Sequence, residues 1–236
     1  MGAIFFILKR ELANYFYSLT AYIVVVLFLL ITGGMFWLEF FSGFPELSMR
    51  SLFSQAPIFL AFFAPAITMG LMAEEKRSGT LELLMTMPVS DTQVVVGKFL
   101  AAVVLLVVTF VCTVPYALSI SMMGNLDWGP VLGGYAGLML LGSAYAAVGI
   151  MVSSWTKDQI VSVLLGFFLC FLLYIVDRLF GNFSGVTAQT LEYLSSNYHF
   201  QNIARGVIEL GDVVYYLSVI AVCLTAARAT LSARRW

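Results

Sequence analysis

The chain has 236 residues, of which 61% are hydrophobic and only 11% charged, with a mean hydropathy of +0.96. This composition leaves too few polar residues to cover a soluble globule, and it also excludes a disordered chain and a collagen-like fibre. Twelve basic and 13 acidic residues give a net charge of −1, so no excess of positive charge favours a nucleic-acid partner.

Six apolar stretches follow one another along the chain, each close to the roughly 20 residues that a membrane-spanning helix needs. They are residues 22–37, 57–73, 99–122, 131–152, 160–176 and 213–227. Runs such as residues 103–108 do not alternate in polarity as barrel strands do. The first stretch begins late and lacks an A-x-A-like exit, so we expect a retained helix and not a cleaved signal. The sequence therefore predicts an all-α integral membrane protein.

The distribution of lysine and arginine predicts the orientation, because cytoplasmic loops carry the excess. With the amino terminus inside, nine fall on the inner side: Lys9, Arg10, Lys76, Arg77, Lys98, Lys157, Arg228, Arg234 and Arg235. Three fall on the outer side: Arg50, Arg178 and Arg205. We therefore expect a multi-pass protein with both termini in the cytoplasm.

Residues 74–90 join the second and third spans on the predicted cytoplasmic side. Gly79 is expected to end the preceding helix, and Pro88 to end the segment that follows. Between them, three apolar residues share one helical face: Leu81, Leu84 and Met85. The pattern predicts a short amphipathic helix, which is either a linker resting on lipid headgroups or a docking element for a cytoplasmic partner.

The third span begins with Ser90-Asp91-Thr92-Gln93, which has the form of a capping box, and Thr156-Lys157-Asp158-Gln159 has the same form before the fifth span. Lys98 lies about two turns into the third helix, close enough to the interface for its stem to snorkel. Pro115, deeper in that helix, removes a backbone hydrogen bond and is expected to kink it.

Small residues recur along the fourth span, where they allow another helix to approach closely. They are Gly129, Gly133, Gly137, Gly142, Ala146 and Gly149. We expect this face to serve packing within the chain in preference to dimerisation.

The longest outer loop, residues 178–212, is too apolar for a simple tether. Residues 191–194 and 203–210 have the pattern of short amphipathic helices, separated by polar residues 195–197. Because this stretch leads directly into the sixth span, it is expected to lie in or dip into the outer leaflet, as a candidate gate.

Catalytic chemistry is not indicated. The one histidine, His199, has no metal-ligand spacing around it, and the adjacent Glu74 and Glu75 point to different helix faces. No P-loop accompanies Gly97-Lys98. The span centres lack charged residues, which argues against proton or sodium coupling. We assign no catalytic, cofactor or metal site to this chain.

Two motifs carry a resemblance to a known family. The segment with Glu74, Glu75, Arg77, Gly79, Thr80, Glu82, Leu84 and Pro88, followed by Gly97-Lys98, resembles the E-E-x-R-x-x-G-T-x-E-x-L pattern of ABC-2 type transporter permeases. The later segment with Tyr198, His199, Phe200, Arg205, Gly206 and Asp212 resembles the gliding-motility-associated permease subunit.

The resemblance implies one ABC-2, type V exporter-like transmembrane domain over residues 1–236. Residues 1–20 would form an interfacial helix, 74–90 the coupling-helix region, and 178–212 the outer re-entrant region. The resemblance also implies the roles of particular residues. ATPase coupling is expected of Glu74, Glu75, Arg77, Gly79, Thr80, Glu82, Leu84 and Pro88, the inner interface is expected at Lys9, Arg10 and Lys98, and outer gate candidates are Tyr198, His199, Phe200, Arg205, Gly206 and Asp212.

The same resemblance implies the partners: two ABC ATPase subunits that hold ATP and Mg, and a second permease chain, alike or related, in a bacterial inner membrane. The expected function is export of a hydrophobic or amphipathic substrate. Two alternatives remain open, a force-transmitting scaffold without cargo and an ATP-independent transporter or channel.

Overall fold

The computed structural model describes residues 2–42, 48–80, 89–180, 193–207 and 209–233. Its helices are α1 (Gly2–Tyr17), α2 (Leu19–Ser42), α3 (Arg50–Ser78), α5 (Asp91–Val111), α6 (Val114–Met123), α7 (Trp128–Trp155), α8 (Gln159–Phe180), α10 (Ser196–Ala204) and α11 (Leu210–Ser232). Six helical segments are long and apolar enough to cross a membrane, which confirms the predicted all-α class. They are Leu19–Phe41, Arg50–Ser78, Asp91–Met123, Trp128–Trp155, Gln159–Leu179 and Leu210–Ser232.

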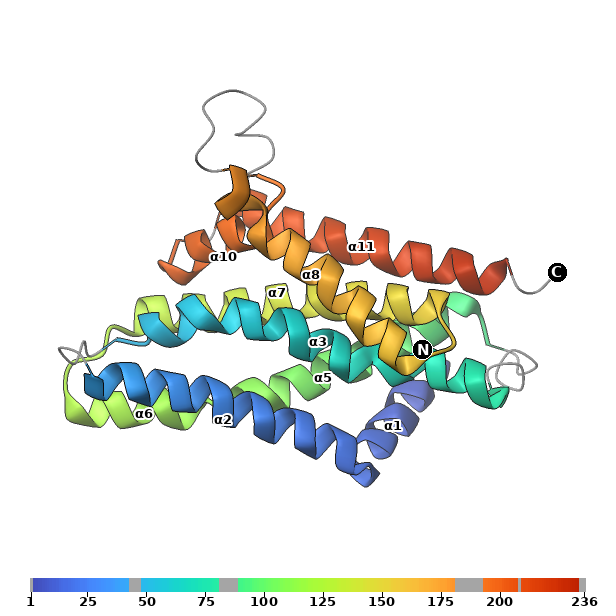
Figure 1. Ribbon diagram of the computed structural model, residues 1–236, viewed down its shortest axis with the longest axis horizontal. Coiled ribbons are helices and arrows are strands. Elements are labelled where there is room, and N and C mark those ends of the chain that lie inside the picture. Colours follow the sequence, from blue (N-terminus) through green and yellow to red (C-terminus); the bar gives the residue numbers. More distant parts are fainter. Residues whose placement is uncertain (1, 43–47, 81–88, 181–192, 208, 234–236) are drawn as a thin grey trace.

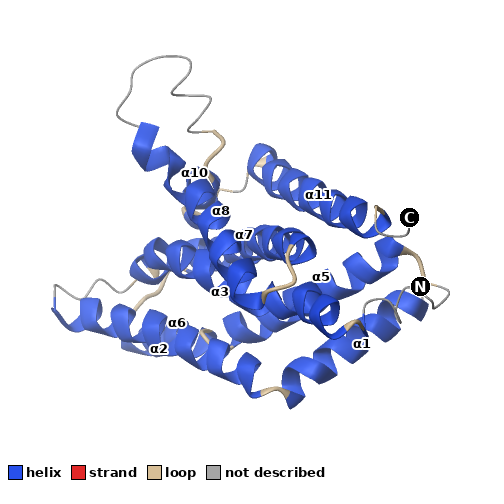
Figure 2. Ribbon diagram, turned by 45° about the vertical axis from the view of Figure 1, so that its right-hand side comes forward, coloured by secondary structure: helices blue, strands red, loops and turns tan. Residues whose placement is uncertain are grey.

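The spans run along the long axis of the molecule, so the bundle has two ends (Figure 1). Both chain termini and α1 lie at one of them, which we call the terminal end. Helix α10 and the connection from α6 to α7 lie at the other, the distal end. Figure 2 shows α1 meeting the bundle obliquely, with a sharp turn into α2.

Helix α7 is the centre of the bundle, with contacts to α3, α5, α8, α10 and α11. Its glycines explain how so many helices approach it. A Cβ atom on Gly133 would lie 2.6 Å from the Ile203 carbonyl oxygen, and one on Gly137 would lie 3.1 Å from the Phe200 ring. The predicted use of this face for packing within the chain is therefore confirmed.

The first predicted capping box is confirmed and the second is wrong. The Ser90 hydroxyl accepts the Gln93 N–H at 3.3 Å, and the Gln93 side chain accepts the Ser90 N–H at 3.0 Å. Before α8, Asp158 accepts the Ile160 N–H instead, at 3.0 Å. The Gln159 amide donates to Glu74 and is not free to bond back to the chain.

The disturbance predicted at Pro115 is a full break in the third span. Helix α5 ends at Val111, and α6 begins at Val114 with the proline in its first turn. The Thr113 N–H donates to the Phe110 carbonyl at 3.0 Å, and its hydroxyl donates to the same oxygen at 2.7 Å. These two bonds tighten the chain at the break, as a membrane environment requires of freed backbone groups.

The predicted helices of the outer loop need correction. Residues 191–192 lie outside the described part of the chain, and Tyr193 and Leu194 form a turn. Ser195, expected in a polar separator, instead caps α10 by accepting the Asn197 N–H at 3.2 Å. The predicted helix over 203–210 is wrong, because α10 ends at Ala204 and Gly206 follows with φ at +89°.

A Gly133→Ala substitution is expected to destabilise the protein by about 2 kcal/mol, because its methyl group would collide with backbone atoms that have no rotamer by which to yield. The measurement is the thermal unfolding midpoint of the purified chain in mild detergent. Gly34→Ala is the matched control, because nothing lies within 4 Å of its Cβ position. An unchanged midpoint for Gly133→Ala would show that α10 does not pack on α7 as closely as described.

Candidate functional site

Helix α1 packs across the terminal end of the bundle, mainly against α5. Its one fully buried apolar side chain among the described residues, Ile7, lies against Val94 and Gly97. A Cβ atom on Gly97 would lie 2.8 Å from the Ile7 side chain, so the glycine lets the two helices approach. The apolar side of α1 is thereby fixed beside the beginning of α5, and its charged residues are brought over the end of α3.

Four charged side chains from three helices meet beneath α1, and we call them the charge cluster: Arg10, Glu11, Glu75 and Lys98. Glu11 accepts hydrogen bonds from Lys98 at 3.0 Å and from Arg10 at 2.5 Å. Glu75 accepts from Arg10 at 2.7 Å, and its other oxygen lies 2.9 Å from the Lys98 ammonium. Two cations and two carboxylates therefore balance in one place.

Lys98 does not snorkel, which corrects the expectation from sequence. Its side chain is 0% exposed. A desolvated ammonium is costly unless charged partners replace its water. Glu11 from α1 and Glu75 from α3 supply those partners inside the protein, so the side chain has no need to reach the interface. Lys9, expected at the same interface, is exposed and outside the cluster.

The cluster also sets the ionisation of two groups on α1. Burial alone would raise the pKa of Glu11, but the neighbouring charges and hydrogen bonds of Lys98 and Arg10 outweigh it, and the pKa is lowered. Burial likewise works to lower the pKa of Arg10, and the two carboxylates beside it raise the pKa overall. Both side chains are therefore held in their charged forms.

Glu74 and Glu75 point to different faces of α3, as predicted. Glu74 accepts from the Gln159 amide on α8 and lies 3.3 Å from Arg77, whose side chain is 68% exposed. Gly79, with φ at +74°, ends α3 as expected, and it and Thr80 are exposed. The remaining residues predicted for ATPase coupling lie outside the described part of the chain: Glu82, Leu84 and Pro88.

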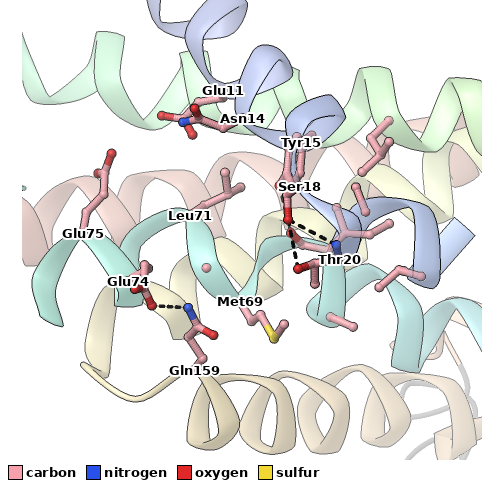
Figure 3. A pocket seen from close by; sticks show the side chains of 16 residues that line it. Glu11, Asn14, Tyr15, Ser18, Thr20, Met69, Leu71, Glu74, Glu75 and Gln159 are labelled. Carbon is pink, nitrogen blue, oxygen red and sulfur yellow. Dashed lines mark hydrogen bonds between the residues drawn. The ribbon is translucent and has the colours of Figure 1, made fainter. Parts of the chain in front are cut away.

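A cavity of about 290 Å³ opens beside the cluster, between α1, α2, α3 and α8. Figure 3 shows Glu11, Asn14 and Tyr15 of α1 on one side and Glu74 with Gln159 on the other. Tyr15 donates to the Ile67 carbonyl at 2.8 Å, and burial raises the pKa of this phenol. The tyrosine thus joins the end of α1 to the middle of α3.

The outer gate candidates divide into a buried group and an exposed group. His199 is fully buried, with Nδ1 2.6 Å from Asp212 and Nε2 2.8 Å from the Tyr193 carbonyl oxygen. Its ring stacks on Tyr215 at 4.1 Å. Both ring nitrogens therefore face oxygen atoms, one of a carboxylate and one of a backbone carbonyl. This histidine fixes α10 against the start of α11.

The other outer candidates do not join that contact. Phe200 is buried against Gly137 of α7, and Tyr198 is half-buried, with its ring centroid 5.4 Å from that of His199. Arg205 and Gly206 are exposed beyond the end of α10. The predicted outer set is therefore divided: His199 and Asp212 pair, Phe200 packs on α7, and Arg205 and Gly206 lie outside both contacts.

Glu11 and Tyr15 are site residues that sequence reasoning missed. The sequence held one signal for Glu11: it is the single acidic residue of α1, and it lies four positions after Ile7. Residues at this spacing share one face of a helix. Within the described residues, no three His, Cys, Asp or Glu side chains form a group suited to a metal ion.

The architecture defines a polytopic helical membrane protein, with an ion-paired helix lying across one end of six spans. The chain belongs to the ABC-2 family of transporter proteins, whose family model matches residues 5–232. A comparison with curated proteins gave no match. Membership makes the chain a membrane permease component and not itself the catalytic subunit, and it implies association with ABC ATPase partners.

Replacing Lys98 with methionine is expected to destabilise the protein by about 3 kcal/mol, because it leaves the buried carboxylate of Glu11 and the partly buried one of Glu75 with only Arg10 as a counter-charge. The thermal unfolding midpoint in detergent measures the loss. Lys157→Met is the matched control, because that lysine is exposed at the same end. Equal midpoints for the two variants would contradict a structural role for the cluster.

The lowered pKa of Glu11 predicts an acid-sensitive contribution to stability. The contribution is fully present above the unfolded-state pKa, about 4.3 for glutamate, and is lost as pH falls through the lower folded-state value. We expect Glu11→Gln to unfold at a lower temperature than the parent near neutral pH, and this difference to shrink in acid. A difference in midpoint that stays constant between neutral pH and about pH 3 would count against the ion pairing.

Proposed function

We propose that the chain is the transmembrane permease subunit of an ATP-driven exporter, whose ATP is hydrolysed on separate subunits. The observation that carries the proposal is the charge cluster. It joins α1 to the last turns of α3 and the first turns of α5. Helices α3 and α5 are the ones on either side of residues 79–90. The cluster thus holds the end of α3 and the beginning of α5, which flank the segment that would receive a push from the ATPase, to each other and to α1.

The geometry supports a transmission route. Glu75 lies three residues before the end of α3, and Lys98 lies in the second turn of α5. A displacement of residues 79–90 would move the end of α3 and the beginning of α5. Helix α1 would follow, because Arg10 and Glu11 bind Glu75 and Lys98. ATP binding to the partners would then shift the population between two arrangements of the bundle.

The exposed residues are the ones proposed to contact the ATPase. Arg77, Gly79 and Thr80 are open to a partner, and Glu74 is 43% exposed beside Arg77. Glu82, Leu84 and Pro88 belong to the same proposed docking segment by their sequence. Glu75 uses its carboxylate inside the protein, so we assign it to transmission and not to the docking surface.

The remaining assignments follow from the resemblance and from charge. We propose a pair of permease chains, alike or related, with two ATPases that hold ATP and Mg, in a bacterial inner membrane. Seven basic residues of the described chain belong to the segments that meet at the terminal end, namely α1, the end of α3, the beginning of α5, the connection from α7 to α8 and the end of α11: Lys9, Arg10, Lys76, Arg77, Lys98, Lys157 and Arg228. Since such an excess is typical of cytoplasmic ends, this supports cytoplasmic termini. The relation to gliding-motility permeases rests on residues 198–216, and the cargo is proposed to be hydrophobic or amphipathic.

The experiment is affinity purification of the tagged chain in mild detergent, with identification of bound proteins and an ATPase assay. An ABC ATPase should accompany the parent chain, and Arg77→Glu should lose it, because the substitution places a carboxylate beside Glu74 on the docking surface. Lys157→Glu is the control, with the same charge change on a neighbouring loop. A parent chain that recovers no ATPase would overturn the proposal and favour an ATP-independent transporter or channel.

Glu75→Gln serves as the second arm of this experiment, because it weakens the cluster and leaves the exposed residues intact. The ATPase should still co-purify, while its stimulation by the permease falls. Loss of binding in this variant would instead place Glu75 in the docking surface. A complex that hydrolyses ATP but moves no cargo would favour the scaffold alternative.

A further inference from the structure

A second cavity, of about 540 Å³, lies at the distal end of the bundle, remote from the charge cluster. It is formed where the beginning of α3, the connection between α6 and α7, and the end of α10 meet. Its size falls within the range of small-molecule sites, roughly 300–1,000 Å³. The segments that build it are distant in sequence, so the tertiary fold alone creates it.

Two arginines from different segments line this cavity, Arg50 at the start of α3 and Arg205 after α10. Both are exposed, and neither has an ion pair or a cation–π contact in the described structure. They are two of the three basic residues that the described chain places at this end. The third, Arg178, lies 5.3 Å from the Tyr174 ring centroid and is not part of the lining.

The one acidic residue of the lining, Asp127, does not neutralise the pair. Its carboxylate caps α7 by accepting the Gly129 N–H at 3.0 Å. The lining therefore carries two positive charges and one negative charge, with the Gln201 amide as a further polar group. Such a balance favours a negatively charged ligand.

Part of the lining is apolar. Met49, Phe53 and Val131 line the cavity, and each is almost fully buried in the bundle. A fully hydrated inorganic ion would gain nothing from this wall. A molecule with an anionic group and an apolar part would match both the arginines and the apolar residues of the lining.

We propose that this distal cavity binds the anionic group, a phosphate or a carboxylate, of an amphipathic molecule, with Arg50 and Arg205 as its ligands. The planar guanidinium donates two parallel hydrogen bonds to such a group and is less strongly hydrated than an ammonium. The apolar part of the ligand lies against Phe53 and Val131. Binding at this site does not require the ATPase, so it can be tested separately from the proposed transport function.

The test is a binding titration of the full chain, in a neutral detergent, with dihexanoyl phosphatidic acid. Arg50→Gln and Arg205→Gln are each expected to weaken binding about tenfold, because each removes a charge-assisted pair of hydrogen bonds. The double variant should bind more weakly still, and binding by the parent should weaken with added salt. Arg178→Gln is the matched control and should bind as the parent does.

Two further probes separate the sources of the anion. Dihexanoyl phosphatidylcholine tests a headgroup without net charge, and inorganic phosphate tests the anion without an apolar part. Phosphatidic acid binding that millimolar phosphate does not displace supports a lipid-like ligand, and displacement supports a soluble anion at the same arginines. Equal affinity across all the arginine variants, or an equal loss in Arg178→Gln, would overturn the proposal. Unchanged thermal midpoints would show that the exposed substitutions leave the fold intact.

Discussion

The buried ammonium of Lys98 is the constraint on which the terminal end of this protein depends. A cation that is 0% exposed must be met by counter-charges, and the two that meet it come from different helices, Glu11 on α1 and Glu75 on α3. Satisfying one side chain therefore fixes the positions of three elements. Helix α1 is not simply resting on a lipid surface, because its charged face is bound into the bundle.

The centre of the bundle obeys a different constraint, close approach without charge. Gly133 and Gly137 bring α10 against α7, while Gly149 brings α3 close, with Pro65 3.2 Å from where a Cβ atom would be. Because lipid tails are as apolar as the side chains, no hydrophobic driving force brings membrane helices together, and their association depends on such close van der Waals packing. The terminal end is thus held by the charge cluster, and the distal end by the buried His199–Asp212 pair together with the small-residue packing of α10 on α7.

Most features encoded within a few residues could be predicted from the sequence, whereas those that depend on distant partners could not, as when Glu74 on α3 takes up the Gln159 side chain of the second predicted capping box. The spans, the Ser90–Gln93 capping box and the break near Pro115 are local, and the structure confirms them. The burial of Lys98 depends on Glu11, 87 residues away in the sequence. The residues next to Lys98 alone therefore indicate an ordinary interfacial lysine. Ser195 was ambiguous for a related reason, because a short polar run serves equally as a separator or as a helix cap.

Helix α3 joins the two proposed sites. It begins at Arg50 in the distal cavity and ends three residues after Glu75 in the charge cluster. It also contains Pro57 and Pro65, each of which removes a backbone hydrogen bond from the helix and provides a point at which it can bend. A displacement applied beyond Ser78 would therefore reach Arg50 along a single helix whose bending points are built into its sequence. A ligand of the distal cavity that favours one arrangement of α3 would shift the population of that arrangement, and by linkage the partner that favours the same arrangement would strengthen its binding.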